Sequence, residues 1–247
     1  MLERIKLYSQ LMRMDKPIGF FLLMWPVLWA FIISSEGSPN IFFLIIFAVG
    51  IIATRSAGCI INDYFDQDFD LKVERTKNRV LATKQVSNNE ALILFGLLIS
   101  LCFMLLLMLD FKIILLAIFS LFLLVIYPLT KRYFKIPQLI LGMAFGSSIP
   151  MVFMLEKGHI DYNCIILYVL TIIWAIVYDT YYAMADKDDD RKIGIKSSAL
   201  FFGDNDITYS LKLHYIVILN FIVLGIINSF NIVYYIFILL SLLCVIY

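Results

Sequence analysis

Two clusters of acidic side chains, NDYFDQDFD at residues 62–70 and YAMADKDDD at residues 182–190, lie 120 positions apart in this chain. Each cluster contains one polar side chain and two carboxylates at four-residue spacing: Asn62, Asp66 and Asp70, then Tyr182, Asp186 and Asp190. Residues four apart on a helix lie on the same side of it. We therefore expect each set to form one polar stripe if its helix continues through the cluster.

The carboxylates of these stripes predict a metal site. Acidic groups at this density beside an apolar segment repel one another and lose hydration, and they persist where a divalent cation needs several oxygens. Mg²⁺ accepts few protein carboxylates and completes its shell with waters and substrate phosphates. The predicted ligand is therefore a metal-bridged phosphate or diphosphate, with solvated loop carboxylates as the alternative. The acids outside the stripes either support the ligands or are solvated: Asp63, Asp68, Asp188 and Asp189.

Cationic side chains follow both acidic clusters and the apolar segment that ends near residue 130. Such residues commonly anchor membrane segments at the lipid headgroups. Some of them are also placed to neutralise a diphosphate whose charge the metal does not fully balance. Arg75 and Lys131 are the candidates for binding the diphosphate, together with Tyr182 of the second stripe.

The composition predicts the elements that position these groups. The chain has 247 residues, of which 62% are hydrophobic and only 16% charged, and its mean hydropathy is +0.90. This excludes a water-soluble domain and predicts an all-α, polytopic membrane helix bundle. A helix needs roughly 20 mostly apolar residues to cross the hydrocarbon core. Eight segments qualify as spans: 17–34, 41–63, 91–109, 112–130, 137–155, 161–183, 211–228 and 231–247. Pro26 and Pro150 fall inside spans and should kink them.

The distribution of cations predicts the orientation. Most of the 20 lysines and arginines lie before the first span or in the loops that carry the acidic clusters, whereas the alternate loops contain only Lys112 and Lys157. This asymmetry predicts that the N-terminus and both clusters face the cytoplasm, or the matrix in a mitochondrion. The net charge of +1 is no sign of a nucleic-acid partner. We predict no protein partner, and the bilayer is the expected environment.

The chain is predicted to be a single domain, 1–247, with a pseudo-repeat of about 1–135 and 136–247. The second and sixth spans each end in an acidic cluster, so the two clusters should face each other across a central cavity. Arg55 and Asp179 lie seven residues before Asn62 and Asp186 respectively, on the same helix face. They either form an ion pair below the site or are satisfied separately.

Five segments resemble the UbiA family of intramembrane aromatic prenyltransferases, and within it the 4-hydroxybenzoate polyprenyltransferase branch. They are LMRMDKPIG (11–19), GCIINDYFDQDFD (58–70) followed by VERT (73–76), YPLTKRY (127–133), PQLILGMAFGSSIP (137–150) and YDTYYAMADKDDDRKIGIKS (178–197). The resemblance implies a nine-helix bundle in which two aspartate-rich motifs hold Mg²⁺ against a polyprenyl diphosphate. It implies five metal and diphosphate ligands: Asn62, Asp66, Asp70, Asp186 and Asp190. It also implies that Arg132 holds the carboxylate of the aromatic acid and that Arg55 lines the acceptor pocket.

The activity implied by the resemblance is transfer of a polyprenyl group to the ring carbon ortho to the hydroxyl of 4-hydroxybenzoate, an early step of ubiquinone biosynthesis. Such an enzyme would lie in the bacterial inner membrane or the mitochondrial inner membrane. The chain reaches Tyr247 inside its eighth hydrophobic segment, one helix short of the family pattern, so we expect a C-terminal truncation. Two alternatives are a secondary transporter with an acidic ion site and an inactive truncated remnant of the enzyme.

Overall fold

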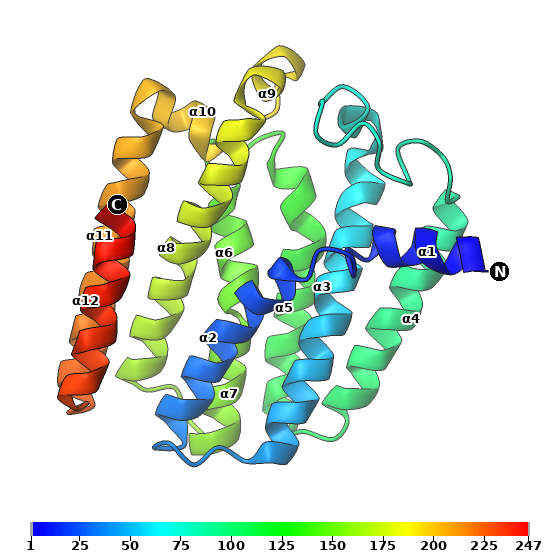
Figure 1. Ribbon diagram of the computed structural model, residues 1–247. Helices are drawn as coiled ribbons and strands as arrows, with labels where there is room; N and C mark the ends of the chain where they lie inside the picture. Colours follow the sequence, from blue (N-terminus) through cyan, green and yellow to red (C-terminus); the bar gives the residue numbers. More distant parts are fainter. Residues whose placement is uncertain (1, 247) are drawn as a thin grey trace.

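The structure, a computed structural model, describes residues 2–246, and these residues form α-helices joined by loops, with one 3-10 turn (Figure 1). The all-α prediction is confirmed. The elements are α1 (Leu2–Leu11), α2 (Ile18–Ser34), α3 (Ile41–Asp70), α4 (Asn88–Leu106), α5 (Phe111–Thr130), α6 (Gln138–Gly146), α7 (Ser148–Lys157), α8 (Tyr162–Ala185), α9 (Lys187–Ile193), α10 (Ser198–Phe202), η1 (Gly203–Asn205), α11 (Asp206–Ile227) and α12 (Ile232–Ile246).

The predicted spans all correspond to helices. Within residues 2–246, six helical segments are long and apolar enough to cross a membrane, and α2 and α12 are shorter apolar helices. The largest difference from the sequence-based boundaries concerns α3, which continues beyond residue 63 to Asp70 and so carries the first acidic cluster on the helix itself. The segment 137–157 is divided into α6 and α7 around Ser147. Pro150 accounts for this division, because proline has no N–H to donate to the carbonyl four residues earlier.

Local sequence fixes where several helices begin. Ser87 and Glu90 form a capping box at the start of α4, in which each side chain accepts from the backbone N–H of the other residue. The Asn40 side chain accepts from the N–H of Phe42 at the start of α3, and Asp161 accepts from Cys164 at the start of α8. These caps satisfy N–H groups that have no partner within the helix.

Figure 1 shows α2, α3, α5, α6 and α8 as neighbouring members of a bundle, with α9 and the loop after α3 at the same end. The core contains buried side chains from both halves of the chain, including Phe31, Phe47, Phe153 and Leu170. We call the end that carries α9 and the loop 71–87 the polar end. Helix α1 runs roughly perpendicular to α4 at the side of the bundle (Figure 1), and its Tyr8 hydroxyl donates to Glu90 at the start of α4 at 2.8 Å.

Candidate active site

The first acidic cluster forms the polar end of α3. Because the helix continues to Asp70, the carboxylates of Asp66 and Asp70 lie one turn apart, and both side chains are buried. The Lys131 ammonium lies between two residues of this stripe. It donates to Asp66 Oδ2 at 2.7 Å and to Asn62 Oδ1 at 3.1 Å. A positive charge therefore already occupies the space between these two oxygens.

A second set of ion pairs involves Asp63, which the sequence analysis left outside the stripe. Asp63 is buried and accepts from Arg13 at 2.9 Å. The Arg79 guanidinium lies 3.0 Å from Asp63 Oδ1 and 2.8 Å from Asp70 Oδ2. Asp63 thus holds Arg79 against Asp70, and it connects the segment before α2 to the end of α3. Nothing in the spacing of the cluster distinguishes this aspartate from the exposed Asp68.

The second acidic cluster contains a helix break that the four-residue spacing did not predict. Helix α8 ends at Ala185, Asp186 has φ −100° and ψ 2°, and a short helix α9 starts at Lys187. The break is mild, because the N–H of Asp190 still donates to the carbonyl of Asp186 at 2.8 Å. Burial, together with the negative charge of Asp186, raises the pKa of Asp190 to about 6.

Arg75, in the loop that follows the first cluster, pairs with a carboxylate of the second cluster. Its Nε donates to Asp186 Oδ1 at 2.9 Å, and this hydrogen bond raises the pKa of the Arg75 guanidinium. Beside it, the backbone N–H of Glu74 donates to Asp189 at 3.2 Å. A small cavity of about 120 Å³ lies between the clusters, lined by two carboxylates from each: Asp66, Asp70, Asp186 and Asp190. The prediction that the stripes converge on one opening therefore agrees with the geometry.

The donor set around this small cavity fits Mg²⁺. Carboxylate and amide oxygens are the ligands that this hard cation takes, and one or two carboxylates with substrate phosphates suffice for it. Within residues 2–246, no three or more Asp, Glu, His or Cys side chains lie close enough together to hold a metal ion. Lys131, Arg75 and Arg79 instead balance the carboxylates. The residues therefore suit a metal that arrives with a phosphorylated ligand.

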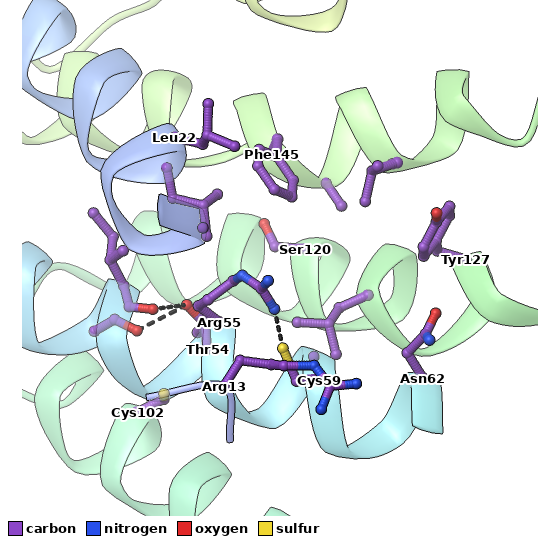
Figure 2. A pocket seen from close by; sticks show the side chains of 18 of the residues that line it. Arg13, Leu22, Thr54, Arg55, Cys59, Asn62, Cys102, Ser120, Tyr127 and Phe145 are labelled. Carbon is purple, nitrogen blue, oxygen red and sulfur yellow. Dashed lines mark hydrogen bonds between the residues drawn. The ribbon is translucent and has the colours of Figure 1, made fainter. Parts of the chain in front are cut away.

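A larger cavity of about 890 Å³ extends from the polar end into the bundle. Figure 2 shows the Arg55 side chain crossing this cavity, with Ser120 and Phe145 on the opposite wall and Tyr127 and Asn62 toward one end. The Arg55 guanidinium donates to the Cys59 sulfur, its one hydrogen-bond partner in the described part of the chain. Most of its N–H groups are therefore available to a ligand.

Gly19 provides the space that Arg55 occupies. A Cβ at this position would lie 2.4 Å from Arg55 Nε and 2.6 Å from Nη2, which are distances that real side chains do not adopt. The glycine of the DKPIG segment thus has a physical role, because it allows the guanidinium to pack against α2. Sequence reasoning identified this segment only through the family resemblance.

Two further polar atoms in this cavity have no partner among the described residues. They are the hydroxyl groups of Tyr178 and Ser148, both buried. A buried hydroxyl without a partner costs free energy, so such groups commonly bind a ligand or water. The two cavities meet at side chains that line both of them: Arg75, Arg79, Tyr127, Lys131, Asp179 and Tyr182. A ligand with a polar end and an apolar body can therefore occupy both cavities at once.

Most of the residues predicted for the site line one or both cavities. Arg132 does not. Its guanidinium donates to the carbonyl of Phe65 at 3.0 Å and lies 5.2 Å from the centre of the Phe69 ring, on the exposed side of α3. Arg55 and Asp179 both line the larger cavity, but they form no ion pair in residues 2–246. Of the two arrangements expected for these charges, the structure shows the separate one.

Fold and site together define a class: a polytopic helical membrane protein with a cation-balanced acidic site that opens into an internal cavity. The sequence model of the UbiA prenyltransferase family matches residues 23–247. This chain belongs to the UbiA prenyltransferase family.

Relatives from two bacteria carry the name 4-hydroxybenzoate octaprenyltransferase. The protein from Azoarcus sp. is 50% identical over 205 residues, which cover 83% of this chain and 71% of the relative. The protein from Photobacterium profundum is 41% identical over 240 residues, covering 97% of this chain and 84% of the relative. These matches place the chain in the 4-hydroxybenzoate polyprenyltransferase branch.

Solved structures have the same fold. A UbiA homolog from Aeropyrum pernix superposes with a TM-score of 0.81 at 24% identity, over 92% of this chain and 86% of that one. A UbiA homolog from Archaeoglobus fulgidus bound to GPP and Mg²⁺ superposes with a TM-score of 0.76 at 15% identity, over 97% and 84%. At these identities the comparison establishes the fold alone.

Proposed function

We propose that this protein transfers a polyprenyl group from a polyprenyl diphosphate to the ring carbon ortho to the hydroxyl of 4-hydroxybenzoate, in a Mg²⁺-dependent reaction. The observation that carries the proposal is the convergence of four motif carboxylates on one small cavity that adjoins a larger one containing Arg55. The names of the relatives supply the substrates. The setting we propose is a bacterial inner membrane.

At the polar end, Asp66, Asp70, Asp186 and Asp190, with Asn62, are the residues that would hold Mg²⁺. The metal, when bound, supplies positive charge that stabilises the departing diphosphate. Lys131 and Arg75 line both cavities, so their charges lie beside the same group. Tyr182, which also lines both cavities, is placed to donate a hydrogen bond there.

In the larger cavity we assign the carboxylate of the aromatic acid to Arg55. A guanidinium with free donors inside a cavity is suited to binding an anion, and a carboxylate matches its geometry. The Tyr178 and Ser148 hydroxyl groups are the further donors available to the acceptor. The structure gives no such reason for Arg132, which lies outside both cavities. The geometry therefore favours Arg55 for the role that the family resemblance gave to Arg132.

In the reaction, the bond between the isoprenoid C1 and the diphosphate oxygen breaks, and the oxygen keeps the electron pair. The resulting allylic cation is captured by the electron-rich ring carbon, and loss of the proton from that carbon restores the aromatic ring. Water would convert the cation to an alcohol, so the walls must exclude it. Phe145, Leu124 and Met151 line the larger cavity and contribute apolar wall to it.

The experiment is incubation of isolated membranes with Mg²⁺, an isoprenyl diphosphate and radiolabelled 4-hydroxybenzoate. We expect a lipid-soluble labelled product from the wild type. Asp66→Asn and Asp190→Asn should each lower its formation at least about 100-fold, because each removes charge from the proposed metal site.

Each of these variants has a neighbour that serves as a control. Asp68 and Asp188 belong to the same clusters, are exposed and line neither cavity. Asp68→Asn and Asp188→Asn should therefore retain activity within about twofold. Equal losses in all four variants, or equal retention, would contradict the proposed site. A transporter would accumulate substrate in vesicles and form no labelled product.

A further inference from the structure

The backbone of Arg13 adopts an unusual conformation in the segment between α1 and α2. Its φ is 57°, in the left-handed region that residues with a Cβ rarely adopt. Four residues other than glycine have a positive φ in the described part of the chain, and among them only Arg13 lines a cavity of the site. Such strain persists where the surrounding structure holds it, often beside a functional site. This points to a function for the contacts that hold Arg13.

The side chain of Arg13 makes these contacts. Its Nη2 donates to both carboxylate oxygens of Asp63, at 2.9 and 3.0 Å, and its Nη1 donates to the carbonyl of Gln10 at 3.1 Å. Asp63 is buried, so water competes little for its oxygens, and a charge-assisted pair is strong in such surroundings. The ion pair therefore joins the segment between α1 and α2 to the polar part of α3.

Beyond Arg13 the chain follows α3 toward Arg55. We call residues 12–17, which connect α1 to α2, the linker. The Ser56 hydroxyl donates to the sulfur of Met14 in the linker at 3.9 Å. Directly after the linker, the backbone of Gly19 lies against the Arg55 guanidinium. The contacts thus continue along α3 for eight residues, or about 12 Å at 1.5 Å per residue.

The ion pair of Arg13 can be lost without leaving a buried carboxylate alone. Asp63 also pairs with Arg79 at 3.0 Å, and Arg79 in turn pairs with Asp70 at the diphosphate end of the site. Arg13 itself lines the larger cavity (Figure 2), but two of its three guanidinium nitrogens already donate to protein oxygens. A change at Arg13 should therefore act on the linker and spare the diphosphate end.

We propose that Arg13 is a positioning residue for the acceptor site. Its ion pair with Asp63 holds the linker against α3. The linker in turn sets how closely Gly19 approaches Arg55, and so fixes the direction of the guanidinium that binds the aromatic acid. This inference rests on the proposed function, which assigns the carboxylate of the acid to Arg55.

The first test is steady-state kinetics of Arg13→Gln, which removes the charge of the pair. The KM for 4-hydroxybenzoate should rise about 5- to 20-fold, while kcat and the KM for the isoprenyl diphosphate change less than about twofold. Phenol has no carboxylate, so kcat/KM for phenol should also stay within about twofold. Arg13→Lys keeps the charge and should bring the KM for the acid back to within about threefold of the wild-type value.

Arg4→Gln is the matched control. The Arg4 guanidinium also ties the N-terminal part of the chain to a distant segment, by donating to the carbonyl of Gln85 at 2.9 Å, but it lines neither cavity. This variant should keep all the wild-type constants. Equal losses for the two acceptors in Arg13→Gln, or the same selective loss in Arg4→Gln, would overturn the proposal.

A double variant separates positioning from direct contact with the acid. In an Arg55→Gln background, Arg13→Gln should raise the KM for the acid by less than about a further twofold, because both changes act through the same guanidinium. A further rise as large as that in the wild-type background would show that Arg13 acts on the acid independently of Arg55. That result would overturn its role as a positioning residue.

Hydrogen exchange measured by mass spectrometry tests the linker without turnover. The N–H groups of Met14 and Lys16 donate to backbone carbonyls, so their exchange reports whether the linker stays folded. Peptides covering residues 12–20 should exchange at least about tenfold faster in Arg13→Gln and at the wild-type rate in Arg4→Gln. Unchanged exchange in Arg13→Gln would overturn the proposal. Absence of product from the wild type would instead refute the proposed function, and the exchange would still report whether Arg13 holds the linker.

Discussion

The contact between Gly19 and Arg55 leads to a prediction about the binding of the aromatic acceptor. In Gly19→Ala the new methyl group would lie 2.4 Å from Arg55 Nε in the present geometry. Ordinary contact starts near 3.4 Å, so the guanidinium must withdraw by about 1 Å. The displaced group is the end of a flexible side chain, and the protein should therefore lose little stability while Arg55 loses its position.

The size of the effect follows from the hydrogen bond between Arg55 and the carboxylate of 4-hydroxybenzoate. A hydrogen bond to a charged group contributes about 1.5–3 kcal/mol, and about 1.4 kcal/mol is a tenfold change. We expect the KM for 4-hydroxybenzoate to rise roughly 10- to 100-fold in Gly19→Ala, with a change of less than about twofold in the KM for the isoprenyl diphosphate. Arg55→Gln should show the same selectivity with a larger loss.

The assay is steady-state kinetics on detergent-purified protein, with phenol as a second acceptor because it lacks the carboxylate. If Arg55 binds the carboxylate, Gly19→Ala lowers kcat/KM for 4-hydroxybenzoate and leaves that for phenol nearly unchanged. Gly96→Ala controls for a glycine-to-alanine change in a helix, since a Cβ there meets no atom within 4 Å. Equal losses for the two acceptors, or a selective loss of isoprenyl diphosphate affinity, would refute the role of Arg55.

Three further predictions concern the polar end. Arg79→Met leaves the buried carboxylate of Asp70 without its cation and removes one of the two cations that pair with Asp63, so it should lower the unfolding temperature in detergent by the equivalent of about 3 kcal/mol. Lys77→Met breaks an exposed pair and should leave the unfolding temperature unchanged. Because the pKa of Asp190 is about 6, its carboxylate gains a proton as the pH falls through 6. The Mg²⁺ concentration for half-maximal activity should therefore rise between pH 7 and pH 5. If this concentration did not change with pH, Asp190 would be excluded as a ligand. Arg132→Ala should leave the KM for 4-hydroxybenzoate within about twofold of the wild-type value. A tenfold increase in this KM would indicate that Arg132, and not Arg55, binds the carboxylate.

The helices and the motif carboxylates were predictable from the sequence because both depend on local properties. Apolar segments near 20 residues become helices regardless of their neighbours, and the spacing of Asn62, Asp66 and Asp70 defines one side of a helix. The predicted span ends at residue 63, where hydropathy falls, and α3 continues beyond it to Asp70, as the stripe of Asn62, Asp66 and Asp70 requires. Proline at position 150 predicted a kink, and the structure divides the segment there.

The partners within the site were not predictable, because they depend on contacts between distant segments. Asp63 pairs with Arg13 and Arg79 across 50 and 16 positions, and nothing in its local sequence separates it from an exposed aspartate. The position of Arg132 outside the cavities depends on its contacts with Phe65 and Phe69, more than 60 positions away in the chain.

The most direct test of the account is a structure of the full chain with Mn²⁺ in place of Mg²⁺ and a non-hydrolysable polyprenyl diphosphate, with the metal located by its anomalous scattering. The account predicts metal at coordination distance, about 2.1 Å for Mg²⁺, from carboxylates of both clusters, with the oxygens of the diphosphate bound to the metal. Metal bound to one cluster alone, or a diphosphate located away from the small cavity, would contradict it.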